Sequence, residues 1–421
     1  MRIAPAERTG PGPVVAAVWK KSMRMLAAVL ALASVLAATG NDAASSTERA
    51  PLLGAVWAGG GELVLLDPFT LQPVRRSGVR LAGGWSTARS GDGSLIAAAS
   101  GSTLHLLDAR TLTVLRSQRV ENRLAVSAWP RPGRLITAPS WSQTGSAVVL
   151  DPLSGRIVAR RPLPGVPLAM TATRNAVVVL LGRRDAIEVL TLVVVAADGD
   201  VRSVRLPGVR GGFRPPGPGG PAALQTQPGL AVDQTGRRAV VVTPTALTDV
   251  DLNTLSVRQR SLAPRRPASL QKTLSGWSRA ALWVTPAILA ITGTNYTPSG
   301  GQGRHEQAPA GLLLADTRSW RVRLVEPEAS EATLADRTLV ATGLRCGSGP
   351  ERCRGIGLRG YTPTGRLRFH LFGSEPLADV RVAGSLAYLS DCNSFCYRIV
   401  DTTRGRLLTT VRTRQQTVLA R

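Results

Sequence analysis

The sequence contains very few of the residues that build catalytic and metal sites. Histidine occurs only as His105, His305 and His370, without metal-ligand spacing and without an H-E-x-x-H motif. A G-x-S-x-G motif, which marks the nucleophile of many hydrolases, is also missing. We therefore predict no catalytic residue, no metal site and no cofactor. A Ser–His–Asp triad built from distant positions stays open, because such a triad needs no local motif.

Aromatic residues make up only 4% of the chain, and lysine occurs three times although the net charge is +25. The positive charge is thus almost entirely arginine, a bias typical of GC-rich coding sequence, but it attracts polyanions and anionic lipids whatever its origin. Nucleic-acid grooves need aromatic stacking platforms between basic residues, so nucleic acid is a poor candidate partner. An anionic polymer of the cell envelope fits better. The candidate anion contacts are Arg210, Arg214, Arg265 and Arg266.

Near the N-terminus, the apolar run Met25–Ala38 is too short to span a bilayer, which needs about 20 residues. Lys20, Lys21 and Arg24 precede it and small residues follow, which is the pattern of a secretory signal. We assign residues 1–44 to a signal region and 45–52 to a short linker. No cysteine follows the run, so a lipoprotein anchor is not expected. An uncleaved signal that tethers the protein to a membrane is the alternative to secretion.

An apolar strand, a short turn and a second strand recur along the chain, mostly at the period of about 40–45 residues that suits a propeller blade. The turn begins at Asp67, Asp108, Asp151, Asp198, Asp251, Asp316, Thr362 and Asp401. Asp accepts hydrogen bonds from backbone amides just ahead of it, and so favours a turn. A second turn upstream completes four strands in most repeats. The prediction is an all-β propeller of about eight four-stranded blades over 53–421, or seven if one unit is irregular.

Two Gly/Pro-rich segments, at about 210–229 and 293–311, lack a strand pattern and are expected to be surface loops inserted between strands. The first repeat has only three expected strands, so the C-terminal "TVLAR" is predicted to supply the fourth and close the ring.

The pairing of an S-x-D-G-like turn, as in "SGDGSLIAAAS" at 90–100, with a D-x-x-T-G-like turn resembles the YVTN-type β-propeller repeats of secreted bacterial and archaeal proteins. The resemblance covers about 50–421 and implies an architecture rather than an activity. WD40 repeats are disfavoured because no Trp-Asp dipeptide occurs. Quinoprotein repeats typically have a tryptophan a few residues after the turn; here only the turn DTRSW has one nearby, Trp320, and it is misplaced.

All four cysteines lie in the last two repeats, in the expected loops between the second and third strands. After an export signal, an even number of cysteines indicates disulfides. We predict the local pairs Cys346–Cys353 and Cys392–Cys396. A four-thiolate zinc site is the alternative, but only the second pair has the usual C-x2–4-C spacing.

These features favour an exported, non-enzymatic binding or protein-interaction module of the cell envelope or extracellular space, expected to be a monomer. Its partner would be an unknown protein or an anionic envelope polymer. The alternative is a hydrolase or oxidoreductase with its site in the central channel, which predicts acids or histidines converging there from several blades.

Overall fold

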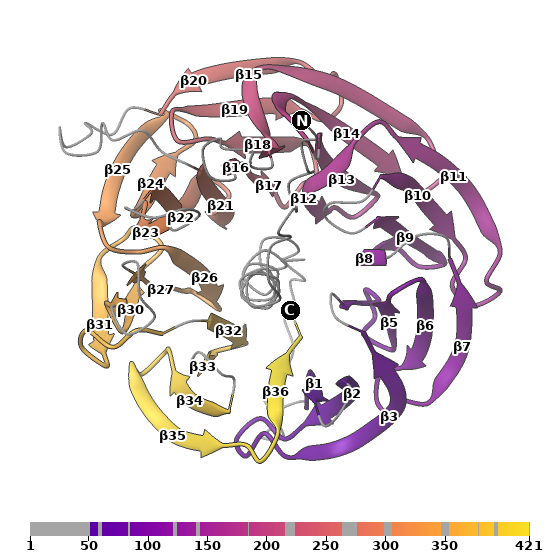
Figure 1. The fold of residues 1–421 in the computed structure, drawn as a ribbon, viewed down its shortest axis with the longest axis horizontal. Helices are drawn as coiled ribbons and strands as arrows, with labels where there is room; N and C mark the ends of the chain where they lie inside the picture. Colours follow the sequence, from indigo (N-terminus) through magenta and orange to yellow (C-terminus); the bar gives the residue numbers. More distant parts are fainter. Residues whose placement is uncertain are drawn as a thin grey trace, which may run out of the picture.

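The computed structural model describes residues 51–57, 61–82, 85–120, 124–139, 144–183, 185–214, 224–262, 276–298, 305–346, 353–377, 379–390 and 395–420. Within these ranges all regular elements are β-strands, arranged as a ring around a central axis (Figure 1). The predictions of an all-β fold and a propeller architecture are confirmed. The signal region 1–44 lies outside the described residues. In the part of the chain that the structure describes, no helix is long and apolar enough to cross a membrane.

Six separate four-stranded antiparallel sheets are present among the described residues. From the centre outwards, they consist of β36 (Gln416–Leu419), β1 (Leu52–Trp57), β2 (Gly61–Leu66) and β3 (Pro73–Leu81); β4 (Ser86–Arg89), β5 (Leu95–Ser100), β6 (Thr103–Asp108) and β7 (Val114–Arg119); β8 (Leu124–Arg131), β9 (Arg134–Pro139), β10 (Gly145–Leu150) and β11 (Ile157–Leu163); β17 (Gly229–Val232), β18 (Arg238–Val242), β19 (Ala246–Asp251) and β20 (Val257–Ser261); β26 (Glu331–Ala335), β27 (Thr338–Thr342), β30 (Leu358–Tyr361) and β31 (Leu367–Leu371); and β32 (Asp379–Ala383), β33 (Leu386–Ser390), β34 (Cys396–Asp401) and β35 (Arg406–Arg412).

The other strands form one twelve-stranded sheet. It contains β12 (Val166–Ala172), β13 (Ala176–Gly182), β14 (Ile187–Ala196), β15 (Val201–Arg214), β16 (Leu224–Gln227), β21 (Gly276–Thr285), β22 (Ile288–Pro298), β23 (His305–Pro309), β24 (Leu312–Asp316), β25 (Arg321–Glu326), β28 (Leu344–Cys346) and β29 (Cys353–Gly355). The prediction of eight, or seven, separate blades is therefore wrong: six are separate among the described residues. The reason is that β16 pairs with strands on both sides of it, β15 and β21, and so joins two regions that the repeat pattern treats as independent.

The ring is closed by the C-terminal strand, as expected. β36 is antiparallel to β1, with Gly54 opposite Leu419 and Trp57 opposite Gln416. The Tyr397 hydroxyl, from the preceding sheet, donates a hydrogen bond to the Thr417 backbone carbonyl. The two ends of the propeller chain therefore hold each other in one sheet.

The eight predicted turns all connect the third and fourth strands of a repeat and lie at one end of the ring, which we call the turn face. In each of the turns beginning at Asp67, Asp108 and Asp251, one carboxylate oxygen accepts two backbone N–H groups ahead of it. These bonds lower the pKa of Asp108 and Asp251; for Asp67, burial raises the pKa, but the bonds from Thr70 and Phe69 outweigh it.

In six of the eight turns, the fourth residue after the opening Asp lies in the left-handed region of backbone conformation. It is glycine in two of these turns, Gly155 and Gly405, but leucine or tryptophan at Leu71, Leu112, Leu255 and Trp320. A non-glycine residue there is strained by roughly 1–2 kcal/mol. Leu71 and Leu112 are each only 1% exposed, so burial of about 1.5–3 kcal/mol per side chain offsets the strain.

Apolar clusters fill the spaces between successive repeats around the whole ring. One cluster joins Leu63 and Leu65 to Ile96 and Leu107, and another joins Leu386 and Ile399 to the first sheet and so spans the closure. The core is thus divided among interfaces between repeats rather than gathered at the centre.

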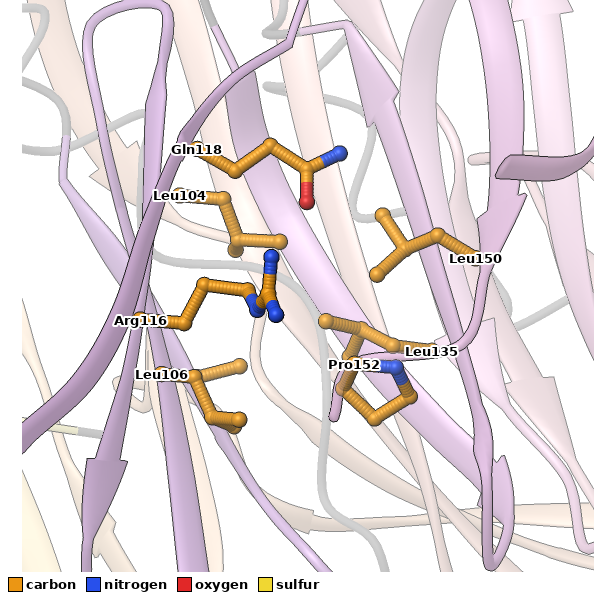
Figure 2. Close-up of a pocket in the computed structure, with 8 residues that line it drawn as sticks. Leu104, Leu106, Arg116, Gln118, Leu135, Leu150 and Pro152 are labelled. Atoms are coloured by element: carbon orange, nitrogen blue, oxygen red, sulfur yellow. The ribbon is translucent and has the colours of Figure 1, made fainter. Parts of the chain in front are cut away.

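Arginines on the outer strands reinforce these interfaces at the rim. The Arg116 Nε on β7 donates to the Leu153 carbonyl in the turn of the next sheet, at 3.0 Å. Figure 2 shows Arg116 and Gln118 pointing towards Leu150 and Pro152 across this interface. The space left between them is about 10 Å³, no more than one water occupies. We call such contacts rim latches.

Three more rim latches link an outer strand to a following turn. Arg161 donates to the Gly199 carbonyl at 2.8 Å, Arg202 to that of Asn253 at 2.9 Å, and Arg368 to that of Thr403 at 2.9 Å. Arginine suits this position because its long stem packs along the strand while the guanidinium reaches the neighbouring repeat.

Candidate functional site

The end of the ring opposite the turn face carries all the long connections, because an antiparallel four-stranded repeat places its first and third connections at one end and its second and fourth at the other. We call it the insertion face. The inserted strands are β16, β23, β28 and β29, and together with the ends of β15, β21 and β22 they form an extension of the twelve-stranded sheet that we call the platform.

The platform begins where β15 continues past its repeat. Its residues Gly212–Arg214 pair with β16, and β16 in turn runs parallel to the start of β21, with Gln225 opposite Gly276. This close approach requires glycine: a Cβ on Gly276 would lie 2.5 Å from the Gln225 carbonyl oxygen. The Gln227 side-chain amide donates to the Leu168 carbonyl at 3.2 Å and ties β16 to the ring.

The middle of the platform is made by β21 and β22. β22 changes partner along its length: Ile288–Ile291 pair with β24 within the ring, whereas Thr294–Pro298 pair with β23 in the platform. The segments expected to be loops at 210–229 and 293–311 therefore contain strands, and that expectation is wrong. Backbone pairing with β14, β16, β21 and β23 orders them, and it needs no alternating apolar side chains.

A buried arginine holds this region together. Arg279 is 7% exposed, and its guanidinium donates to the carbonyls of Ser278 and Thr294 at 2.7 and 3.1 Å and to the Asn295 side-chain oxygen at 2.8 Å. Tyr296 lies beside it, and burial raises the pKa of its hydroxyl. These residues belong to no recognisable motif in the sequence. The one available signal was a charged residue within the otherwise uncharged segment 276–285.

At the far edge of the platform is a small hairpin, β28–β29, closed by the predicted disulfide between Cys346 and Cys353. It joins β23 through the pair Gln307–Cys346. Arg345 on the hairpin forms an ion pair with Glu328 at 3.1 Å. The hairpin lies between β27 and β30, as predicted for the loop that contains these cysteines.

The remaining cysteines are only partly described. Cys396 begins β34, whereas Cys392 lies outside the described residues, so the pair Cys392–Cys396 stays a prediction.

The candidate anion contacts are not brought together by the described residues. Arg210 is exposed on β15, next to the platform. Arg214 is the last residue of the same strand, but its side chain is not described, and Arg265 and Arg266 lie outside the described residues. Their role stays a prediction.

Among the described residues, no group of three or more His, Cys, Asp or Glu side chains is placed to hold a metal ion. Asp379, on the inner strand β32, forms an ion pair with Arg381 at 3.2 Å rather than joining other acids. His105 lies on the third strand of its sheet, its Nδ1 2.8 Å from the Ser117 hydroxyl, and burial lowers its pKa. His370 lies on the outer strand β31 and contacts the carbonyls of Ile356 and Gly373, both at 3.0 Å.

A cavity of about 320 Å³ opens where the ring closes, between the first and last sheets. Leu52 and Pro68 line one side, and Ala383, Ser385 and Tyr388 line the other. Its walls are mostly apolar, and it lies on the turn-face side, away from the platform.

No protein-family model matches the chain, and no curated protein matches its sequence. Among solved structures, the dihydro-heme d1 dehydrogenase NirN in complex with DHE is similar, with a TM-score of 0.57 and 14% identity over 93% of this chain and 80% of that one. Apo AztD from Citrobacter koseri has a TM-score of 0.53 and 14% identity over 87% of this chain and 96% of that one. At this identity the likeness supports the propeller fold alone.

Proposed function

We propose that the protein is an exported, non-enzymatic binding or protein-interaction module of the cell envelope or extracellular space, and that the platform is its binding surface. The observation that carries the proposal is the parallel pairing of β16 with β21 across two repeats. Closure of the ring depends on β36 and β1 and uses none of the inserted strands. Strands also hold contact residues more rigidly than loops do, which favours binding.

Export is supported by the Cys346–Cys353 disulfide, which is compatible with an oxidising compartment. The proposal keeps residues 1–44 as a secretory signal, with an uncleaved, membrane-tethered form as the alternative. The partner is an unknown protein or an anionic envelope polymer, and the protein acts as a monomer.

We also propose that the ring contains eight repeating units, six of them separate blades and two joined within the twelve-stranded sheet. The eight turns and the apolar clusters between successive repeats support this count. The proposal includes the similarity to the YVTN-type β-propeller repeats, because the motifs on which that similarity rests are these same turns.

A loss of binding without a loss of stability would test the platform. The double variant Cys346→Ser/Cys353→Ser loosens the hairpin, which joins the rest of the platform at one residue pair. We expect at least a tenfold drop in retention of the exported full-length protein on isolated cell envelope. A matched control, Gln72→Ser/Thr113→Ser, changes two exposed positions on the turn face and should bind like the original protein. Unchanged retention of the cysteine variant would contradict the proposal.

The alternative function is a hydrolase or oxidoreductase with a site in the central channel. Its support is the fold shared with a protein described as a dehydrogenase in complex with DHE. Absorption spectra and metal analysis of the exported protein separate the two: a stoichiometric chromophore or metal ion would favour the enzyme.

A further inference from the structure

The positive charge of the described strands is concentrated on those farthest from the axis. These outer strands are β3, β7, β11, β15, β20, β25, β31 and β35, which lie at the rim of the ring (Figure 1). They contain eighteen arginines and a single acidic residue, Glu326. The other described strands contain ten arginines and ten acidic residues, so their charges balance. Codon bias alone does not explain why acidic residues are missing from the rim.

Some rim arginines have structural roles. Four form the rim latches, Arg76 forms an ion pair with Glu62 at 2.6 Å, and Arg260 stacks on the Trp320 ring at 4.9 Å. The single acid is not available to offset the others, because Glu326 is 3% exposed and accepts hydrogen bonds from Arg359 and Tyr361.

The side chains of ten further rim arginines make no hydrogen bond, ion pair or ring contact with any residue that the structure describes. All ten are exposed. They include one from each of six outer strands: Arg75, Arg119, Arg210, Arg258, Arg321 and Arg406. Unpaired guanidinium groups thus occur on six of the eight outer strands, all except β11 and β31.

We propose that these outer strands form a cationic belt that binds a linear acidic glycan or glycopolymer carrying repeated carboxylate or phosphate groups. Guanidinium groups match both oxyanions with paired donors. A flexible linear chain can follow the rim from one outer strand to the next, whereas a flat membrane touches only one sector of a ring. Apart from the end of β15, which belongs to both, the belt is a different surface from the platform and does not depend on it.

Nucleic acid fits the belt less well. The outer strands contain two aromatic residues, Phe213 and Phe369, and both are half-buried among the described residues. A nucleic acid would therefore find arginines without the stacking surfaces that single strands require.

The test compares two variants with the same net charge. The belt variant replaces Arg119, Arg258 and Arg406 with glutamine. The control replaces Arg89, Arg131 and Arg174, three exposed arginines that lie on inner strands or on the turn between β12 and β13. Binding of the full-length protein to a labelled linear polyuronate and to a linear polyphosphate is measured across a salt series, and the two polymers distinguish carboxylate from phosphate. Phosphatidylglycerol vesicles and an oligothymidylate are measured in parallel.

For one or both polymers, we expect the belt variant to bind at least tenfold more weakly at low salt. The salt dependence of its binding should also be weaker. The magnitude of the slope of log affinity against log salt concentration should fall by about one for each replaced arginine that contacts the polymer in the original protein. The control should stay within twofold of the original protein. Equal weakening of both variants would show only diffuse attraction to net charge and overturn the proposal, as would tighter binding to vesicles or oligothymidylate than to either polymer. Envelope retention of the cysteine variant is a separate measurement, so a failed belt leaves the platform proposal untouched.

Discussion

The two faces of the ring are ordered by different kinds of contact. On the turn face, each connection is held by its own residues: the Asp67 carboxylate accepts N–H groups from Phe69 and Thr70, two and three residues ahead. On the insertion face, order comes from segments far apart in the chain, as where β16 pairs with β21 some fifty residues later. Local contacts recur with the repeat, whereas distant pairing occurs once and creates a surface that no other part of the ring has.

The largest effect is expected on the turn face, from Leu112→Ala. Leu112 is 1% exposed and packs between the first and second sheets, so its truncation should lower the free energy of unfolding by about 3 kcal/mol. Chemical denaturation measures the loss. Leu115→Ala is the matched control, because Leu115 is 51% exposed on the following strand and should change stability by less than about 0.5 kcal/mol.

The same position tests the strain in the turn. Leu112 has a φ of 56°, which glycine adopts freely and alanine does not. Leu112→Gly should therefore be more stable than Leu112→Ala by about 1 kcal/mol, although it removes more side chain. If the alanine variant is the more stable of the two, backbone strain at position 112 does not contribute to the stability of the turn.

The turn face was predictable because its signals are short. The Asp at the start of each turn (Thr362 in one of them), the bend residues after it and the apolar strands beside it lie within about ten residues, and the predicted positions of all eight turns are confirmed. Ring closure by the C-terminus followed from counting three strands in the first repeat. The Cys346–Cys353 pairing followed from their short separation.

The platform was not predictable in the same way. The strands in 210–214 and 293–298 lack apolar alternation, and backbone pairing with β14, β16, β21 and β23 orders them. Arg279 depends on Asn295 and Thr294, whose positions become relevant only once β21 and β22 are paired. The rim arginines were visible in the sequence, but only the side-chain contacts in the structure show which of them form rim latches and which belong to the belt.

The next largest effect is expected on the insertion face, from Gly276→Ala. The added methyl group would meet the Gln225 carbonyl oxygen at 2.5 Å, so β16 must move away from β21. We expect a loss of about 2 kcal/mol, with faster amide hydrogen exchange confined to 224–227. Gly91→Ala is the control, since a Cβ there meets no atom within 4 Å. Faster exchange throughout the ring would show that the platform is part of the ring's cooperative unit.

A smaller effect is expected from Asp67→Ala. The substitution removes the acceptor for the Phe69 and Thr70 backbone N–H groups, at 3.0 and 2.7 Å, and for the Thr70 hydroxyl at 2.9 Å. The N–H groups of this exposed turn can bind water instead, so we expect a loss of about 1 kcal/mol by denaturation. Asp67→Asn keeps an oxygen acceptor and should lose less. Equal losses would indicate that the charge, rather than the acceptor geometry, stabilises the turn.

The smallest expected effect is on the pH dependence of stability, through a single turn. In Asp251, hydrogen bonds from the Thr254 and Asn253 backbone lower the carboxyl pKa from its ordinary value of 3.8. Because the folded pKa lies below the unfolded one, the carboxylate stabilises the fold fully above the unfolded value. That stabilisation is lost as the pH falls through the lowered, folded value. The melting temperature should therefore change little from this group above about pH 5 and fall below about pH 4. Asp251→Asn should start lower at pH 6 and fall less steeply in acid, since one titrating group is gone. Parallel curves for the two proteins would mean that this turn opens before the ring unfolds, and that its local order, unlike that of Leu112, is not coupled to the packing between repeats.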